Sequence, residues 1–218
     1  MAPKQRDRVR PDVAGHLPSE SPPLRDDAEL AHLALSGDYS DLDVSLVEIV
    51  GCRIEQAQLT GSRLARCRLI DCVVIACDLS GVFFEDCTVT RVEFHGCRLS
   101  GLQATGTTFI DVGMFDCKIV DANFRMTNWK RAEFEHCDLA TADFYSAVLP
   151  DTSFERCDLT GVQLAKADLR GSRLNGSKLE GLQGADGLQG VTIGSDQIIP
   201  AALAVFAAMN IRINDVVS

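Results

Sequence analysis

Residues 132–144 read AEFEHCDLATADF, and this stretch contains the rule that decides the fold. Large apolar side chains recur every five residues, at Phe134, Leu139 and Phe144, and a small side chain stands two residues before each of them. No polar residue interrupts the large apolar position from Tyr39 to Leu179. An α-helix buries a face about every 3.6 residues and a strand every second residue, so neither holds a rule of five over such a length. The pattern predicts a solenoid of short turns.

Glycines and charges predict how this solenoid closes. Ten of the eleven glycines between residues 39 and 182 stand two residues after the large apolar position, where a corner tolerates backbone angles that a Cβ resists. Residues of one type, or of alternating charge, recur at every twentieth position and form regular columns, whereas every fifteenth position gives no such column. Each coil is therefore expected to have four five-residue sides and a square cross-section. The columns are Asp71, Arg91, Asp111, Arg131 and Asp151, alternating in sign, and Cys77, Cys97, Cys117, Cys137 and Cys157.

The repeat resembles that of the pentapeptide-repeat proteins, whose consensus is A(D/N)LXX. Matching triplets are Ala122-Asn123-Phe124, Ala142-Asp143-Phe144 and Ala167-Asp168-Leu169. The resemblance implies a right-handed quadrilateral β-helix. At about 4.8 Å per coil, residues 39–182 form about seven coils and a rod about 35 Å long. We therefore predict an all-β solenoid of this kind with a short helix at each end.

The two ends depart from the repeat. Residues 1–25 hold five of the seven prolines and predict a disordered tail. Residues 26–38 have an acidic start and a glycine stop, and predict a helix that caps the first coil. Residues 183–218 predict an irregular half-coil, in which the five-residue spacing resumes one residue early, and then a helix that Ser195 can cap, with a break or restart at Pro200.

The C-terminal helix also predicts a homodimer. Residues 201–209 are apolar on every side, so the last coil alone cannot bury them. A symmetric partner chain would supply the second covering surface. Leu203 and Phe206 are the expected anchors of this dimer interface.

Nine cysteines would ordinarily suggest a metal site or disulfides. All nine occupy the small inward position of the repeat, so we expect them to pack as small hydrophobic residues. The four histidines share no column, and no nucleophile with a base and an orienting acid can be assembled from the repeat. The sequence therefore predicts no catalytic residues, no metal site and no cofactor.

The net charge and the hydropathy pattern indicate which binding partners and which cellular location to expect. The formal net charge is −10, which disfavours direct binding to nucleic acid because phosphate binding relies on an excess of lysine and arginine. No apolar run is long enough for a membrane helix, and the N-terminus lacks the apolar segment of a secretory signal. We expect a cytoplasmic protein that contacts no membrane and binds another protein.

Acidic residues exceed basic ones in the repeat by 21 to 15, and the middle of the rod is expected to be the most acidic surface. The predicted binding residues there are Asp111, Asp116, Asp121, Glu133, Glu135 and Asp143. The aromatic residues Phe83, Phe115 and Tyr145 break the polar rule at outward positions. They are either contact anchors for a partner or an apolar patch that the N-terminal tail or neighbouring side chains cover.

In size, acidity and C-terminal layout the chain resembles the quinolone-resistance proteins of the Qnr type and their mycobacterial relatives. That resemblance implies a modulator that imitates duplex DNA and binds DNA gyrase. A duplex 35 Å long carries about 20 phosphate charges, whereas the repeat nets six negative charges, 21 against 15. Two hypotheses therefore stay open, a DNA-mimicking gyrase modulator and a structural scaffold or adaptor for another protein. Only the first requires one continuous acidic stripe.

Overall fold

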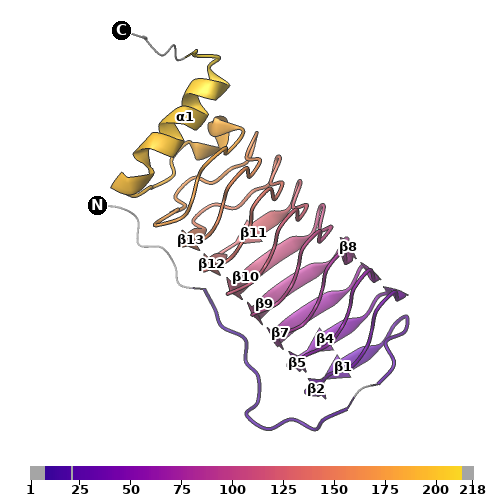
Figure 1. The fold of residues 1–218 in the computed structure, drawn as a ribbon. Helices are drawn as coiled ribbons and strands as arrows, with labels where there is room; N and C mark the ends of the chain where they lie inside the picture. The colour runs from indigo at the N-terminus through magenta and orange to yellow at the C-terminus, as the bar shows by residue number, and fades with distance from the viewer. Residues whose placement is uncertain (1–7, 21, 213–218) are drawn as a thin grey trace.

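The computed structural model describes residues 8–20 and 22–212, and in it the chain winds into a rod of stacked coils (Figure 1). All the strand pairs are parallel. The strands are β1 (Glu29–Ala31), β2 (Ala34–Leu35), β3 (Asp43–Ser45), β4 (Glu48–Val50), β5 (Arg53–Glu55), β6 (Arg63–Ala65), β7 (Arg68–Ile75), β8 (Phe83–Glu85), β9 (Thr88–His95), β10 (Thr108–Phe115), β11 (Asn128–Lys130), β12 (Glu133–Glu135) and β13 (Ser153–Glu155). The prediction of an all-β solenoid is confirmed.

The predicted register of twenty residues is also confirmed. Val89 of β9 lies between Leu69 of β7 and Phe109 of β10, each twenty residues away. A column of isolated bridges runs from Asp38 to Lys178 in seven steps of twenty. Like-phased residues of neighbouring coils are therefore stacked directly on one another.

Four sides follow from this register. Side A holds β4, β11 and the first halves of β7, β9 and β10, and side B holds β5, β12, β13 and the second halves of the same three strands. Side C carries the bridges from Asp38 to Lys178, and side D carries β3, β6 and β8.

Most corners between sides have a left-handed backbone, including non-glycine corners such as Asp71 (φ 52°) and Asp111 (φ 57°). Aspartate tolerates this conformation better than most residues because its short side chain can hydrogen-bond locally.

The interior is filled by the large apolar residues and by the cysteines. Aromatic rings stack between coils, with ring centroids 3.8 Å apart for Phe109 and Trp129 and 4.8 Å apart for Phe134 and Phe154. All nine cysteines are buried and free, as the repeat predicts. The Sγ atom of Cys117, for example, donates to the carbonyl of Phe94 at 3.5 Å.

The prediction of a capping helix over residues 26–38 is wrong. This segment contains β1 and β2, which pair with β4 and β5 at a register of nineteen residues. Leu30 and Leu35 are buried and keep the five-residue spacing, one residue out of phase with Tyr39. The repeat therefore begins earlier than Tyr39, and the one-residue shift places Leu35 four residues before Tyr39, a spacing that an amphipathic helix also has.

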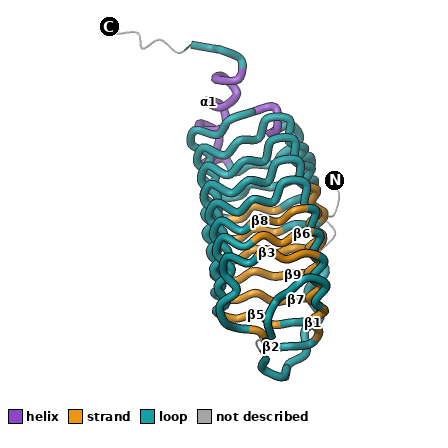
Figure 2. Tube along the Cα trace, turned by 90° about the vertical axis from the view of Figure 1, so that its right-hand side faces the viewer, coloured by secondary structure: helices purple, strands orange, loops and turns teal. Residues whose placement is uncertain are grey.

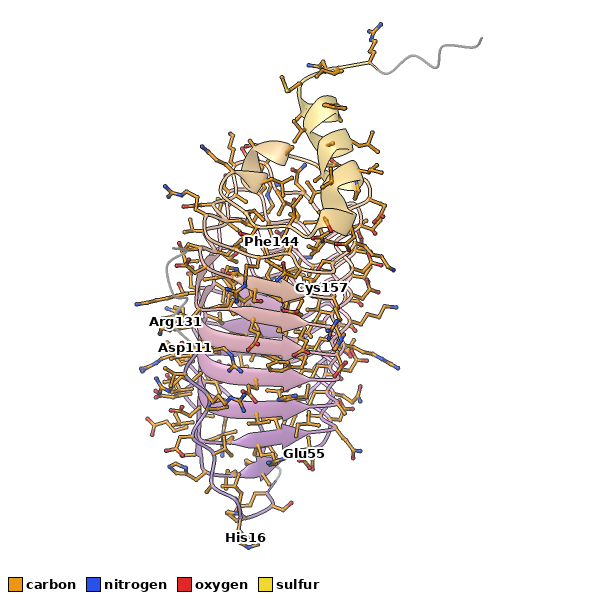
Figure 3. All side chains as sticks on the ribbon, turned by 90° about the vertical axis from the view of Figure 1, so that its left-hand side faces the viewer. His16, Glu55, Asp111, Arg131, Phe144 and Cys157 are labelled. Carbon is orange, nitrogen blue, oxygen red and sulfur yellow. The ribbon has the colours of Figure 1, made fainter. Side chains whose placement is uncertain are left out.

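The prediction of a disordered tail is wrong for residues 8–20. These residues run in an extended path from the middle of the rod toward its N-terminal end (Figure 1), where His16 lies (Figure 3). Ala34 of β2 donates its N–H to the carbonyl of Pro18 at 2.9 Å, and Glu20 donates to the carbonyl of Ala34 at 3.1 Å. The rest of that prediction falls on residues 1–7 and 21, outside the described residues, and on residues 22–25, of which Leu24 is buried against the core.

The C-terminal end contains η1 (Ala185–Leu188), η2 (Ser195–Gln197) and α1 (Ile198–Ala208). Arg173 pairs with Thr192 at a register of nineteen, so the five-residue spacing does resume one residue early. Pro200 lies in the first turn of α1, where a missing N–H costs nothing, and the helix has no break there. Gln197, not Ser195, caps the turn by accepting the N–H of Gly194 at 2.7 Å. Within the described residues, no helix is long and apolar enough to cross a membrane.

Candidate functional site

The six acidic residues predicted for the middle of the rod lie on different sides of it. Three are corner residues with a left-handed backbone, Asp111 between sides A and B, Asp116 between B and C, and Asp121 between C and D. Glu133 and Glu135 belong to β12 on side B, whereas Asp143 pairs with Asn123 on side D. Together they form a girdle around the rod and not one stripe along it.

Asp111 is not part of an exposed surface, and its assignment to the acidic surface is wrong. Its side chain is 4% exposed and accepts hydrogen bonds from Nε and Nη2 of Arg131, which lies directly above it in Figure 3. The backbone N–H of Val9 also donates to Asp111 Oδ1, at 3.0 Å. Burial by itself would raise the pKa of Asp111, but these hydrogen bonds outweigh it and hold the pKa below its usual range. The carboxylate of Asp111 is thus fully engaged by partners within its own chain.

Asp71 repeats this arrangement two coils away. Nε and Nη2 of Arg91 each lie 2.6 Å from an Asp71 carboxylate oxygen, and these hydrogen bonds lower the pKa of Asp71. Asp71 Oδ1 accepts the backbone N–H of Asp12 at 3.3 Å. The column of alternating charges at the corner of sides A and B therefore forms ion pairs between coils, and its aspartates also hold the N-terminal segment.

The predicted acids Asp116, Asp121 and Asp143 differ in exposure and in their partners. The side chain of Asp116 is 77% exposed, with His136 Nδ1 3.9 Å away. Asp121 accepts a hydrogen bond from Thr141 Oγ1 at 2.5 Å. Asp143 pairs with Arg125 Nη1 at 2.8 Å. Asp116 and Asp121 are exposed, whereas Asp143 is half-buried.

Acidic residues do gather on side B. Between β9 and β13, the outward positions of side B hold four glutamates and neither lysine nor arginine. The sequence prediction included two of these residues and missed the other two. Stepping by twenty along side B from residues 93 and 95 would have found all four. They are Glu93, Glu133, Glu135 and Glu155.

An arginine of the N-terminal segment occupies this acidic side. Nη2 of Arg8 lies 2.7 Å from Glu93 Oε1, and its Nε lies 3.4 Å from Glu133 Oε2. Its guanidinium carbon is 5.6 Å from the ring centroid of Phe115, and its side chain is only 6% exposed. The ring of His95 stacks on Phe115 with centroids 4.9 Å apart. Arg8 is thus enclosed by carboxylates and an aromatic ring, and Phe115 is partly covered by the tail.

Gly113 gives the guanidinium its room. A Cβ at this position would lie 2.9 Å from Arg8 Cζ and 2.6 Å from Phe115 Cε2. Gly113 is the one glycine of the repeat that is not at a corner, and its backbone does not need the left-handed conformation. We call Glu93, Gly113, Phe115 and Glu133 the Arg8 site.

Comparisons with known proteins agree with the geometry of the coils. The sequence pattern of the pentapeptide repeat region matches residues 47–124 and 127–187, more than half of the chain. The chain belongs to the pentapeptide-repeat family. No curated protein matches it.

Solved pentapeptide-repeat structures resemble this chain in fold alone. One is a trypsin-treated variant of QnrB1, a plasmid-mediated fluoroquinolone resistance protein, at 21% identity over 91% of this chain and 97% of that one, with a TM-score of 0.43. Another is HetL, involved in heterocyst differentiation regulation, from the cyanobacterium Nostoc sp. strain PCC 7120, at 17% identity over 73% and 90% of the two chains, with a TM-score of 0.39.

The C-terminal end of this pentapeptide-repeat protein presents the predicted dimer anchors on its surface. Leu203 is 50% exposed and Phe206 is 38% exposed on α1, whereas Ala204 is buried. Ile198, Ile199 and Met209 are still more exposed. The exterior of α1 is therefore apolar and uncovered by the described residues of its own chain.

The histidines, cysteines and acids of the repeat do not converge. Among residues 8–20 and 22–212, no group of three or more such side chains is arranged to hold a metal ion. Burial raises the pKa of the Cys72 thiol to about 12, so its nucleophilic thiolate form is scarce at neutral pH.

Proposed function

We propose that this pentapeptide-repeat protein is a non-catalytic, cytoplasmic rod that binds another protein through side B. The observation that supports the proposal is the row of four glutamates at outward positions of side B between β9 and β13, where no outward position holds a lysine or an arginine. Like charges on neighbouring strands repel one another, and a basic partner surface relieves that repulsion. Of the four, Glu135 and Glu155 have no ion pair with a lysine or an arginine among the described residues, so they remain to attract such a partner.

The proposed functional unit is a homodimer joined through α1. The exposed residues Leu203 and Phe206 lie at the end of the rod, opposite the N-terminal coil (Figure 1). A second copy related by a two-fold axis would cover the same apolar patch on both chains, which is the simplest closed arrangement. Two rods joined end to end would also double the length of side B that a partner can contact.

DNA gyrase is the first partner to test, because the sequence resembles the Qnr-type branch. The girdle of acids and their pairing with arginines favour contact through one side over imitation of duplex DNA on every side. A structural scaffold or adaptor for a different protein is the second candidate, and the same acidic side B supports it.

The test compares two variants with the same change in net charge. Glu133→Gln/Glu135→Gln/Glu155→Gln neutralises side B, and Asp116→Asn/Asp121→Asn/Asp143→Asn neutralises three acids elsewhere on the girdle. Purified gyrase is captured on the wild-type protein and on each variant, with and without competing DNA, and supercoiling activity is measured in parallel. We expect the side B variant to lose at least about 10-fold in binding and the control variant to lose much less.

Two outcomes of this test decide between the hypotheses, and the second leads to a further experiment. Equal losses in the two variants would favour DNA mimicry by the whole girdle over contact through side B. Absence of gyrase binding at low salt would reject gyrase as the partner. Affinity capture from a cell extract with the wild-type protein and the side B variant would then test the scaffold hypothesis, which requires a partner that only the wild-type protein retains.

A further inference from the structure

The side chain of Arg8 is enclosed by the rod, whereas the residues that follow it are exposed or half-buried. That side chain is 6% exposed, whereas Val9 is 51% exposed and Arg10 is also exposed. No residue from Val9 to Leu17 is buried. The segment is therefore held against the rod at one end by the Arg8 site, and at the other by the backbone hydrogen bonds between Pro18, Glu20 and Ala34.

The backbone of the segment is held in register with the coils. Val9 and Asp12 donate their N–H groups to Asp111 and Asp71, which belong to the same corner column two coils apart. Three residues of extended chain span about 10 Å, and two coils also span about 10 Å. The corner of sides A and B thus offers acceptors at the spacing of an extended peptide, independent of the side chains that the peptide carries.

The Arg8 site favours an arginine side chain over a lysine side chain. A guanidinium is planar and can donate in two directions while it lies against an aromatic ring, which an ammonium group cannot reproduce. Here it donates to Glu93 and Glu133 and lies beside Phe115, in the space that Gly113 leaves open. Burial by itself would raise the pKa of Glu93, but the hydrogen bonds from Arg8 and His95 hold that pKa below its usual range, so the carboxylate stays charged.

The present occupant does not satisfy the site completely. Nη1 of Arg8 is buried and has no hydrogen-bond partner among the described residues. A buried donor without an acceptor weakens the complex that contains it. The segment also gains from its covalent tether, which gives it an effective concentration of about millimolar. Binding of the segment therefore depends on the tether as well as on its contacts.

We propose that this corner of the rod is a binding site for an extended, arginine-bearing segment of a partner protein, and that residues 8–12 occupy it in the free protein. The inference rests on the proposed function as a protein-binding rod and adds the chemistry of the partner. The partner segment replaces Arg8 between Glu93 and Glu133 and takes over the two aspartate acceptors. Residues 8–12 thereby act as an internal competitor that sets how strongly a partner must bind.

The test uses the full-length chain and an acetylated, fluorescently labelled peptide with the sequence of residues 8–17. The peptide is titrated with the wild-type protein, with Arg8→Ala and with Arg10→Ala as a matched control, because Arg10 carries the same charge but is exposed. We expect Arg8→Ala to bind the peptide at least about 10-fold more tightly than the wild type, and Arg10→Ala to behave as the wild type. Peptides in which Arg8 is replaced by alanine or lysine should bind the Arg8→Ala protein at least about 10-fold more weakly.

Hydrogen exchange of the Val9 and Asp12 amides gives an independent measurement on the same variants. Arg8→Ala should speed their exchange about 10-fold, and Arg10→Ala should not. The proposal is overturned if the Arg8→Ala protein does not bind the peptide, or if it binds the alanine peptide equally well. No gyrase is present in this titration, so its failure is distinct from a failure of the capture experiment.

Discussion

The register changes in the same way at both ends of the rod, but the apolar side chains at the two ends are covered differently. At each end the register changes from twenty residues to nineteen, between β1 and β4 and between Arg173 and Thr192. At the N-terminal end the chain buries Leu24 in the core, holds residues 9–12 at the corner of sides A and B and pairs residues 18–20 with Ala34 of β2. At the C-terminal end α1 buries Ala204 but leaves Leu203 and Phe206 exposed.

The N-terminal end of the rod is therefore covered by its own chain, whereas the C-terminal end leaves apolar side chains uncovered. Strands are also concentrated toward the N-terminal end, whereas the coils near α1 are mostly turns and isolated bridges (Figure 2). A large apolar surface at the end of a rod favours association with a second such surface. We therefore expect changes at the C-terminal end to alter association and changes at the N-terminal segment to alter stability and competition for side B.

The largest expected effect is at the uncovered end. Phe206→Asp places a charge in the proposed dimer interface and should weaken dimerisation by about 2–4 kcal/mol. Phe83→Asp is the matched control, because Phe83 is 41% exposed and Phe206 is 38% exposed, but Phe83 lies on side D. Light scattering after size exclusion should give the mass of a dimer for the wild type and the control and of a monomer for Phe206→Asp. A wild-type mass of one chain would contradict the proposed dimer.

The next effect concerns the covered corner. Asp111→Ala removes the acceptor of both Arg131 and the Val9 N–H, and should lower the free energy of unfolding by about 2–3 kcal/mol. Asp121→Ala removes the same side chain from another left-handed corner of the same coil, where it is exposed, so it shares the backbone cost of about 1 kcal/mol for alanine at positive φ but should cost at least about 1 kcal/mol less than Asp111→Ala. Urea unfolding of the two variants measures the difference. Equal losses would show that the N-terminal segment and Arg131 do not depend on Asp111.

The five-residue rule predicted the coils because one constraint, a large apolar residue at a fixed phase, repeats too often to be ambiguous. It could not predict the N-terminal coil, because a shift of one residue places Leu35 four residues before Tyr39, a spacing that also fits a helix. Composition made the tail look disordered, since its contacts come from a single arginine and from backbone amides. Gly113 was the available signal, as the one glycine between residues 39 and 182 that is not at a corner.

Acid pH should loosen the covered corner through Asp71 and Asp111. The pKa of each is lower in the folded protein than its usual value, so each contributes stability that is present above about pH 4 and lost as the pH falls through the folded pKa. The wild type should therefore lose stability as the pH falls below about 4, in addition to the loss from other carboxylates. Asp111→Asn should flatten this part of the curve of unfolding free energy against pH. An unchanged slope in that variant would contradict the assignment.

The smallest expected effect compares opening at the two ends through buried thiols. Cys52 lies near the covered end and Cys157 near the uncovered end, and both are buried. In the wild-type protein neither should react quickly with a thiol reagent, because labelling requires local opening of the coils. In the monomeric Phe206→Asp variant the coils next to α1 lose their cover, so Cys157 should be labelled at least about 3-fold faster than Cys52, as read by mass spectrometry of the digested protein.

Arg8→Ala supplies the opposite control, since it releases the N-terminal segment and leaves α1 unchanged. It should leave the labelling of Cys157 as in the wild type. If Cys52 reacts first in the Phe206→Asp variant, the covered end is the weaker one and the comparison between the two ends is reversed.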